Sequence, residues 1–200
     1  MSKLTAPAAE RNKEPILAVL RDQLPKTGTV LEVASGTGQH AAYFAPRLAP
    51  LQWLPSEKEE SQLASIAAWR EEVSCEGLLA PIQLNVLKTP WLIESVQISA
   101  IVNINMLHIA PWACCNALFA EAAKLLLSEG KVVLYGPFRR GGQHTAPSNA
   151  LFDGQLRKQD AAWGVRDIEA VSETAEHHHF CCAAVIEMPA NNLSLVFSKR

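Results

Sequence analysis

The stretch that most constrains the fold is VLEVASGTGQHAAYFA, residues 30–45. It opens in a β-branched, apolar run that predicts a buried strand over residues 28–34. Gly36 and Gly38 follow, and apolar residues then recur at helical spacing over residues 39–48. A strand that turns through glycines directly into a helix is the first half of a βαβ unit, so this stretch predicts a parallel α/β sheet.

The remainder of the chain continues the alternation of strands and helices. Apolar, β-rich runs predict further strands over residues 51–56, 77–86, 97–107, 131–138, 180–188 and 193–199. Amphipathic runs predict helices over residues 13–24, 59–73, 113–127, 150–160 and 167–176, and RRGGQHTAPSN (139–149) predicts an irregular loop. The last two strands are joined by the short connection PANN and should pair antiparallel. We expect one α/β domain over residues 1–200, with a Rossmann-like sheet of about seven strands, mostly parallel, an antiparallel C-terminal hairpin and helices on both faces.

Composition and charge argue against several classes of partner. The 200 residues are 48% hydrophobic and 19% charged, as in globular proteins. The net charge of −2 and the lack of a basic tract argue against nucleic acid, and no apolar run is long enough to cross a membrane. The N-terminal residues lack the apolar core of a signal peptide, and the five cysteines have no metal-binding spacing. We therefore expect a cytoplasmic protein with reduced thiols, no nucleic-acid partner and no membrane partner.

The glycine turn is compatible with two cofactors. Gly36, Gly38 and Ala41 have the spacing of a dinucleotide-binding turn. Glu57 follows the second strand, where a carboxylate can accept hydrogen bonds from both ribose hydroxyls of either NAD or S-adenosyl-L-methionine. Glu32 separates the two cofactors, because a negative charge below the turn opposes a pyrophosphate and favours a cationic sulfonium ligand that also carries an ammonium group.

Glu32, the small Ala34 and the two glycines together resemble motif I of the class I S-adenosylmethionine-dependent methyltransferases. Longer segments are similar to one family of that class, the methyltransferase-like 26 proteins, also designated DUF938. These segments are AERNKEPIL (9–17), LEVASGTGQH (31–40), NMLHIAPW (105–112), LYGPFRRGGQHTAPSNALFD (134–153), WGVRD (163–167) and EMPANNLSLVF (187–197). The resemblance covers nearly the whole chain and implies the methyltransferase fold, of which the terminal antiparallel hairpin is a hallmark, with S-adenosyl-L-methionine as the cofactor.

The residue patterns and the resemblance together give a set of cofactor-binding candidates. They are Arg11, Asn12, Glu32, Ala34, Ser35, Gly36, Thr37, Gly38, Glu57, Asn85, Val86, Asn105 and Met106. Glu57 stands where the family usually has an aspartate, and Asn85 lies in LNV where the family commonly has LDV. In the family pattern that aspartate would accept a hydrogen bond from the adenine amino group. Asn85 can accept it through its amide oxygen, without a charge.

Residues after the fourth and fifth strands are candidates for the methyl acceptor's side, because sheets of this type bind ligands beyond the carboxyl ends of their strands. His108 is the first candidate for a general base and His144 the second. The glycine-containing stretch after the fifth strand is expected to act as a lid. Candidates for substrate contact or lid function are Tyr135, Arg139, Arg140, Asn191 and Asn192. Consecutive histidines in EHHHF (176–180) point in different directions on a helix, so no metal site is expected.

The sequence therefore predicts an S-adenosyl-L-methionine-dependent methyltransferase that acts on a small-molecule acceptor. It specifies neither the acceptor nor the oligomeric state. Two alternatives stay open. One is an NAD(P)-dependent oxidoreductase, which the spacing of Gly36, Gly38 and Ala41 supports. The other is a non-catalytic binding module that keeps the cofactor fold and acts through a partner protein.

Overall fold

The structure is a computed structural model that describes residues 3–93 and 96–200. Seven strands form a mostly parallel α/β sheet that includes antiparallel strands, which confirms the predicted fold class. The chain separates into two compact units, Met1–Asn103 and Ile104–Arg200. The expectation of one domain over residues 1–200 stays a prediction.

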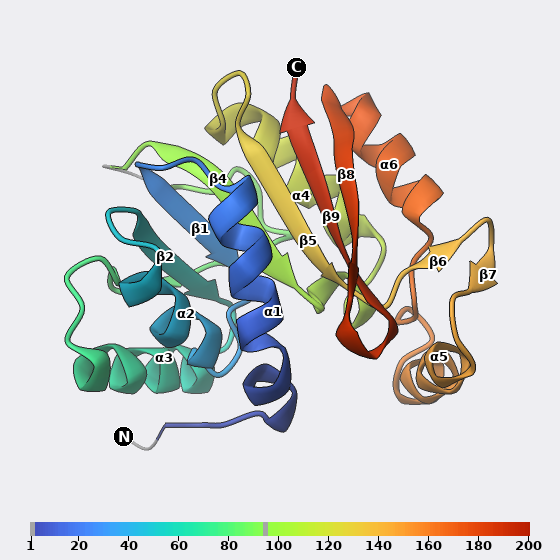
Figure 1. Ribbon diagram of the computed structural model, residues 1–200, viewed down its shortest axis with the longest axis horizontal. Coiled ribbons are helices and arrows are strands. Elements are labelled where there is room, and N and C mark those ends of the chain that lie inside the picture. Colours follow the sequence, from blue (N-terminus) through green and yellow to red (C-terminus); the bar gives the residue numbers. More distant parts are fainter. Residues whose placement is uncertain (1–2, 94–95) are drawn as a thin grey trace. The chain divides into compact units, whose positions relative to one another are not determined.

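The first unit holds four parallel strands in the order β3-β2-β1-β4. The strands are β1 (Thr29–Val33), β2 (Gln52–Glu57), β3 (Ile82–Gln83) and β4 (Ile98–Ile104). The helices are α1 (Pro7–Gln23), α2 (Gln39–Phe44), the short 3-10 turn η1 (Ala45–Arg47) and α3 (Glu60–Val73) (Figure 1). All five residues of β1 are buried, as expected for a central strand of a parallel sheet.

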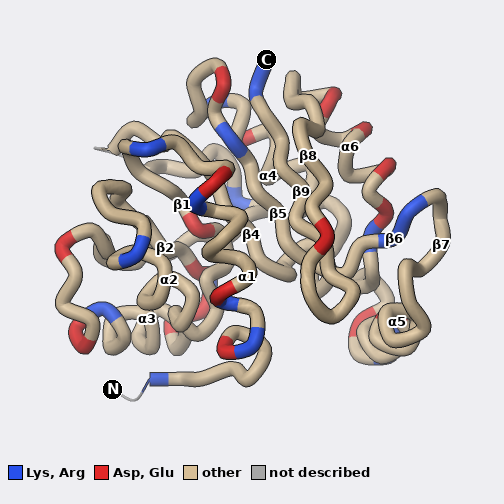
Figure 2. Tube along the Cα trace, viewed as in Figure 1, with Lys and Arg blue, Asp and Glu red and all other residues tan. Residues whose placement is uncertain are grey.

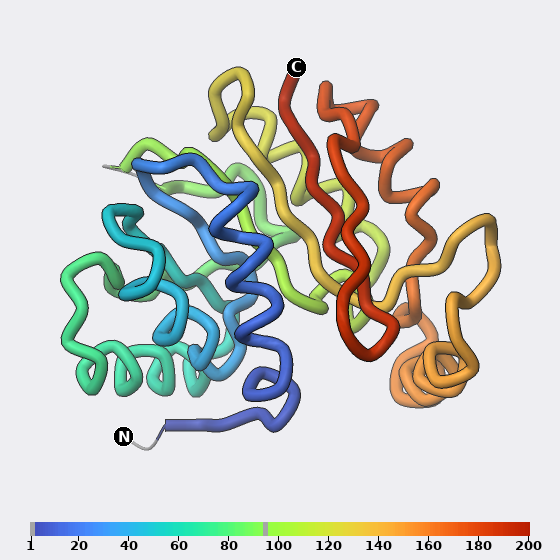
Figure 3. Tube along the Cα trace, viewed as in Figure 1, coloured from blue at the N-terminus to red at the C-terminus, as the bar shows by residue number. Residues whose placement is uncertain are grey.

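The N-terminal segment is ordered further toward its start than the sequence predicts. α1 begins at Pro7, because a proline in the first helical turn lacks only an N–H that has no intrahelical partner there. Before this helix, residues 3–6 run along α3 (Figure 3), and the Leu4 N–H donates to Ser65 Oγ at 2.8 Å. The Leu4 carbonyl in turn accepts a hydrogen bond from Trp69 Nε1 at 3.0 Å. The segment is thereby fixed to the helix that packs behind the glycine turn.

The third predicted strand is much shorter than expected. The sequence predicts a strand over residues 77–86, but only β3 and an isolated bridge between Trp53 and Leu78 form. Pro81 lies between them and has no N–H to donate to a ladder. The ladder is consequently interrupted at Pro81 and resumes only for the two residues of β3, after which the chain leaves the sheet and lines a pocket.

The second unit is built on three strands, with β9 antiparallel to both β5 and β8. The strands are β5 (Lys131–Gly136), β8 (Phe180–Met188) and β9 (Asn192–Lys199). The helices are η2 (Met106–His108), α4 (Ala113–Leu125), α5 (Pro147–Gln159), α6 (Ile168–His177) and η3 (Pro189–Asn191). The core is aromatic, since the Phe119 ring lies 5.5 Å from that of Phe180 and 5.1 Å from that of Phe197.

The stretch after β5 is more regular than the predicted loop. Its first half forms a two-stranded ribbon of β6 (Arg139–Arg140) and β7 (Gln143–His144), paired antiparallel (Figure 1). Gly141 and Gly142 connect the two strands at φ values of 54° and 75°. Two consecutive residues at positive φ make the tight turn that suits a twisted hairpin, and glycine adopts it without steric cost. The prediction of an irregular loop is therefore wrong for this half.

Helix α6 is amphipathic, with acidic residues on its exposed side. It carries Glu169, Glu173 and Glu176 at exposed positions spaced three and four apart (Figure 2). Its opposite side buries Val171 and Ala175. Within residues 3–93 and 96–200, no helix combines the length and the apolar character needed to cross a membrane.

Candidate functional site

The turn between β1 and α2 brings backbone amides to an open surface. Ala34, Gly36 and Gly38 have positive φ values of 57°, 56° and 88°. A Cβ on Gly38 would lie 2.8 Å from Ile66 Cα of α3, so glycine is required there by close packing. A Cβ on Gly36 would meet nothing within 4 Å. Gly36 therefore faces free space, into which a ligand can approach the backbone.

The end of β2 holds this turn in place. The Ser35 N–H donates to the Ser56 carbonyl at 2.8 Å, and Ser56 Oγ donates to the Glu32 carbonyl at 2.8 Å. The Gly36 N–H donates to Glu57 Oε2 at 3.0 Å. The other carboxylate oxygen of Glu57 accepts the N–H of Lys58 at 2.7 Å. The structure thus brings Glu57, Ser35 and Gly36 together, as the predicted cofactor site requires.

Glu57 keeps acceptor capacity toward a ligand. Each carboxylate oxygen can accept two hydrogen bonds, and each is engaged by one backbone N–H. The remaining capacity suits a pair of hydroxyl donors, such as those of a ribose. Because the two N–H groups fix the carboxylate, little side-chain entropy is lost when a ligand binds.

Glu32 lies below the turn and is shielded from solvent. Its side chain is 1% exposed, and Oε2 accepts a hydrogen bond from Trp53 Nε1 at 2.9 Å. Burial raises the pKa of Glu32 to about 7, and the charge of Glu57 adds to the rise, while the hydrogen bonds from Trp53 and Ser35 oppose it. The main-chain carbonyl of Glu32 anchors the turn. The predicted interaction with a ligand ammonium group stays a prediction.

A second layer supports the turn from the side of α3 and the N-terminus. Ser65 Oγ donates to the Thr37 carbonyl at 2.8 Å while it accepts the N–H of Leu4. The predicted cofactor residue Asn12 lies on α1, where its Oδ1 is 2.8 Å from His40 Nε2 at the start of α2. Burial lowers the pKa of His40 to about 4, so this ring is neutral near pH 7. Arg11, by contrast, is exposed on α1.

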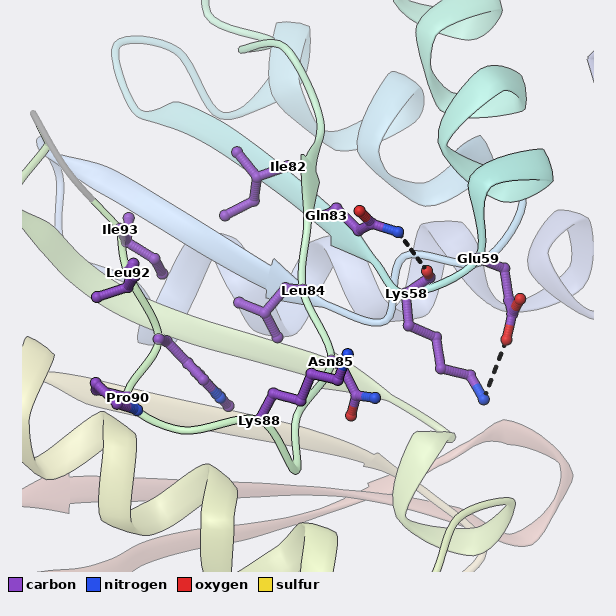
Figure 4. Close-up of a pocket in the computed structure, with 11 residues that line it drawn as sticks. Lys58, Glu59, Ile82, Gln83, Leu84, Asn85, Lys88, Pro90, Leu92 and Ile93 are labelled. Carbon is purple, nitrogen blue, oxygen red and sulfur yellow. Dashed lines mark hydrogen bonds and ion pairs between the residues drawn. The ribbon is translucent and has the colours of Figure 1, made fainter.

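A pocket of about 480 Å³ lies beside β3 in the first unit (Figure 4). It is lined by Lys58, Glu59, Ile82, Gln83, Leu84, Asn85, Lys88, Pro90, Trp91, Leu92 and Ile93. Of the predicted cofactor residues only Asn85 lines it, and the neighbouring Val86 is buried with its carbonyl 3.2 Å from Trp91 Nε1. The sequence analysis did not predict a site role for Lys58, Lys88 or Trp91. The mixture of apolar and basic residues in the run that follows β3 is the sequence feature that could have indicated this pocket.

His108, in the second unit, is buried and neutral. The side chain is 1% exposed, and burial, followed by the charge of Arg166, lowers its pKa to about 3. Nδ1 accepts the N–H of Arg166 at 3.4 Å, which places the ring proton on Nε2. Nε2 is itself buried and has no hydrogen-bond partner among the described residues. The ring packs edge-on against Phe138, with the centroids 4.8 Å apart. This geometry favours hydrogen-bond donation by His108, and the predicted general-base role stays untested.

The remaining acceptor-side candidates lie on the ribbon and near it. Arg139 stands directly opposite His144 in the register of β6 and β7. Arg139 Nη2 pairs with Asp167 at 2.6 Å, and His144 Nε2 lies 3.5 Å from Asp153 Oδ2. Arg139 Nε and His144 Nδ1 are buried without a partner among the described residues. The exposed Arg140 pairs with a carboxylate of β8 at 2.7 Å.

Predicted residues at the strand ends have mainly backbone roles in the structure. Asn105 has a φ of 65° and donates its N–H to the carbonyl of the buried Tyr135 at 2.9 Å. Met106 is buried directly after it. In the hairpin turn, Asn191 has a φ of 58° and its carbonyl accepts a hydrogen bond from α5 at 2.9 Å, whereas Asn192 has a φ of −91°. Asn192 therefore does not need a left-handed conformation.

The histidine run lies at the end of α6 and in the turn before β8. His178 Nε2 lies 2.9 Å from Asn116 Oδ1 of α4, and His179 has a φ of 66° at the end of α6. Over the part of the chain that the structure describes, no group of three or more His, Cys, Asp or Glu side chains is placed to hold a metal ion. The five cysteines are free thiols.

Comparison with known proteins gives one family match. The model of the family described as "Protein of unknown function (DUF938)" matches residues 3–199. This span includes every residue of the turn, the pocket and the acceptor-side group described above.

Several solved structures of similar fold are methyltransferases. An O-methyltransferase family protein from Burkholderia thailandensis superposes with a TM-score of 0.78 at 15% identity, over 96% of this chain and 57% of that one. Mitomycin 7-O-methyltransferase gives 0.79 at 9% identity, over 96% and 54%. A methyltransferase of calicheamicin biosynthesis, solved in its SAH-bound form, gives 0.71 at 13% identity, over 94% and 54%. The chain therefore spans little more than half the length of these structures, and at such identities the likeness shows the fold.

Proposed function

The chain belongs to the DUF938 family of proteins of unknown function, and from that premise we propose that it binds S-adenosyl-L-methionine and transfers its methyl group to a small-molecule acceptor. One observation carries the proposal: the Cα of Gly36 faces free space, while the Gly36 N–H donates to Glu57 at the end of β2 and fixes its carboxylate beside that space. Two backbone-fixed carboxylate oxygens beside an open glycine turn suit a ribose. Methyltransferases of the same fold support this choice of cofactor.

The charge around the turn favours a cationic ligand over a dinucleotide. Glu57 is held against the turn, and Glu32 lies directly below it. The Glu57 carboxylate opposes a pyrophosphate, whereas it tolerates or attracts a sulfonium ligand with an ammonium group, and Glu32, whose pKa is about 7, can ionise when such a cation binds. The spacing of Gly36, Gly38 and Ala41 alone supports NAD(P), so binding has to be measured for both cofactors.

The residues of the chain serve the reaction mainly by alignment. When bound, S-adenosyl-L-methionine supplies an electrophilic methyl group that an acceptor takes by in-line displacement, so orientation and exclusion of water dominate the rate. Glu57, whose carboxylate is held by the Gly36 N–H, fixes the cofactor's ribose end. On the acceptor side, the unpartnered Nε2–H of His108 lies buried against Gly136 of β5, and it can orient an acceptor oxygen only if ligand binding opens this contact. The roles of Tyr135, Arg139, Arg140, His144, Asn191 and Asn192 in substrate contact or lid closure belong to this proposal.

Calorimetric titration with S-adenosyl-L-methionine, S-adenosylhomocysteine and NAD tests the cofactor. We expect both methyl-donor ligands to bind and NAD to bind weakly or not at all. In Glu57→Gln, the affinity for S-adenosylhomocysteine should fall by about tenfold, because an amide offers one acceptor oxygen instead of two. The control is Glu60→Gln, an exposed carboxylate in the first turn of α3, which should bind as the wild type does.

Two outcomes contradict the proposal. Failure of both methyl-donor ligands to bind at millimolar concentration rejects the cofactor, and wild-type affinity in Glu57→Gln rejects the ribose assignment. A screen of small-molecule acceptors for release of S-adenosylhomocysteine then separates an enzyme from a non-catalytic binding module. The narrower relationship to methyltransferase-like 26 proteins and a cytoplasmic location, in keeping with five free thiols, are parts of the same proposal.

A further inference from the structure

Two polar side chains of the pocket beside β3 have orientations fixed by the backbone: Gln83 Nε2 donates to the Lys58 carbonyl at 3.1 Å, and Asn85 Oδ1 accepts the N–H of Leu87 at 3.0 Å. Asn85 and Lys58 stand on one side of the pocket, across from Pro90, Leu92 and Ile93 (Figure 4). Asn85 is half-buried and begins the turn that carries the chain away from β3. Its amide is therefore the group that meets the edge of a ligand resting between the apolar walls.

Hydrogen bonds of the turn determine which end of the Asn85 amide is available. The N–H of Leu87 lies 3.0 Å from Asn85 Oδ1, and the N–H of Lys88 donates to the main-chain carbonyl of Asn85 at 2.9 Å. A backbone N–H can only donate, so the side-chain atom facing Leu87 must be the oxygen. Among the described residues, no hydrogen bond engages Nδ2. The group of the Asn85 side chain that is free to meet a ligand is consequently its NH₂, which is a donor.

The surroundings of Asn85 reinforce this donor character. Lys88 also lines the pocket, and within the described ranges no carboxylate pairs with its ammonium group. Leu84 and Trp91 supply buried apolar surface suited to a flat ring. A ligand edge that is complementary to this wall must carry a lone pair, as the ring nitrogens of a purine do. An exocyclic amino group offers only hydrogens and makes no bond with Nδ2.

From this geometry we infer that Asn85 is a specificity-determining residue that donates to a ring nitrogen of the cofactor's adenine and leaves its 6-amino group unread. The inference rests on the proposed function, because it takes the base of S-adenosyl-L-methionine to occupy this pocket. It reverses the polarity expected from sequence, where the Asn85 oxygen stood in for an aspartate that accepts from the amino group. Replacement of that aspartate by asparagine is then a change of recognition and not only a loss of charge.

Two ligands and three variants test the inference. The ligands are S-adenosylhomocysteine and its 6-deamino analogue, in which purine replaces adenine and all ring nitrogens remain. Wild-type protein should bind the two within about threefold of each other. In Asn85→Asp, one carboxylate oxygen keeps the Leu87 bond and the other accepts from the amino group, so S-adenosylhomocysteine should bind about tenfold tighter than the analogue. Asn85→Ala should weaken both ligands equally.

The matched control is Gln52→Glu, the same amide-to-carboxylate change at an exposed position at the other end of β2. Its side-chain oxygen still accepts from Thr29 Oγ1, and it should leave the wild-type ratio of affinities unchanged. A loss of about tenfold or more on the deamino analogue in the wild type overturns the inference while the proposed function stands. Binding of neither ligand overturns both. An unchanged ratio in Asn85→Asp also overturns it, because the residue would then not face the 6-position.

Discussion

Glu32 in the first unit and His108 in the second are both ionisable groups at 1% exposure, but the structure treats them differently. The Glu32 carboxylate accepts a hydrogen bond from Trp53 and its backbone anchors the glycine turn. The His108 ring accepts one long bond from the Arg166 amide, and its Nε2 has no partner among the described residues. A buried polar group that is satisfied supports structure, whereas an unsatisfied donor costs stability until a ligand accepts from it.

The same burial gives the two groups opposite effects on stability as pH changes. The pKa of Glu32 rises from 4.5 to about 7, so the folded state binds more protons and stability falls as pH increases through that window. The pKa of His108 falls from 6.5 to about 3, so the unfolded state binds more protons and stability rises with pH over that window. Between pH 4.5 and 6.5 the two contributions oppose each other.

The largest expected change in the pH dependence of unfolding free energy comes from replacing His108. In His108→Gln, a rise in unfolding free energy on the order of 4 kcal/mol between about pH 3 and 6.5 should disappear. Stability should then change little between pH 4.5 and 6.5, because the falling contribution of Glu32 is opposed by the rising one of His40, whose pKa is lowered to about 4, and it should decline from pH 6.5 to about 7. Urea unfolding at a series of pH values measures this. A profile parallel to that of the wild type would show that His108 is not buried in its neutral form.

Replacing Glu32 should have the opposite effect on the pH dependence of unfolding free energy. Glu32→Gln keeps an oxygen for Trp53 Nε1 but cannot ionise, so a decline on the order of 3 kcal/mol between pH 4.5 and about 7 should vanish. Stability should then rise with pH, driven by His108 and by His40, whose pKa is also lowered. The same urea series is informative here. If the variant still loses stability toward pH 7, another carboxyl group causes the decline.

The difference between the two regions also explains what sequence could predict. The strand over 28–34, the turn at Gly36 and the acid at Glu57 follow from local patterns, because strand, turn and helix are specified by adjacent residues. The presence of this turn and of the acid beside it could therefore be predicted from the sequence. The β6–β7 ribbon was missed, since two glycines in a polar stretch predict a loop as readily as a hairpin.

The sequence could not predict which polar atoms of a side chain are free to bind a ligand, and the reason is a different one. The LNV motif placed Asn85 in the site, but which amide atom is free to meet a ligand depends on a hydrogen bond from the N–H of Leu87 in the turn that follows β3. The environment of His108 likewise depends on Gly136, which is distant in sequence. Such contacts arise only when separate segments pack, so local periodicity carries no information about them.

Two glycines provide the smallest expected effects and the closest comparison between the regions. In Gly136→Ala, the new Cβ would lie 2.1 Å from His108 Nε2, and the buried ring cannot swing away from Phe138. We expect a loss of about 2 kcal/mol in unfolding free energy, as for other overpacked cores, and partial recovery in the double variant with His108→Ala. Gly36→Ala meets no atom within 4 Å and bears only the strain of a φ of 56°, about 1 kcal/mol.

Gly136→Ala should be the more destabilising variant, but for ligand affinity the two variants should rank in the opposite order. The Gly36→Ala methyl group occupies the space into which the cofactor approaches, so this milder variant should lose more affinity for S-adenosylhomocysteine than Gly136→Ala does. Urea unfolding of the two variants ranks their stabilities, and calorimetric titration of the same samples ranks their affinities for S-adenosylhomocysteine. If Gly36→Ala binds the ligand as the wild type does, the open face of the turn is not where the cofactor lies. If Gly136→Ala is as stable as the wild type, His108 is free to move, and its Nε2 is not confined against β5.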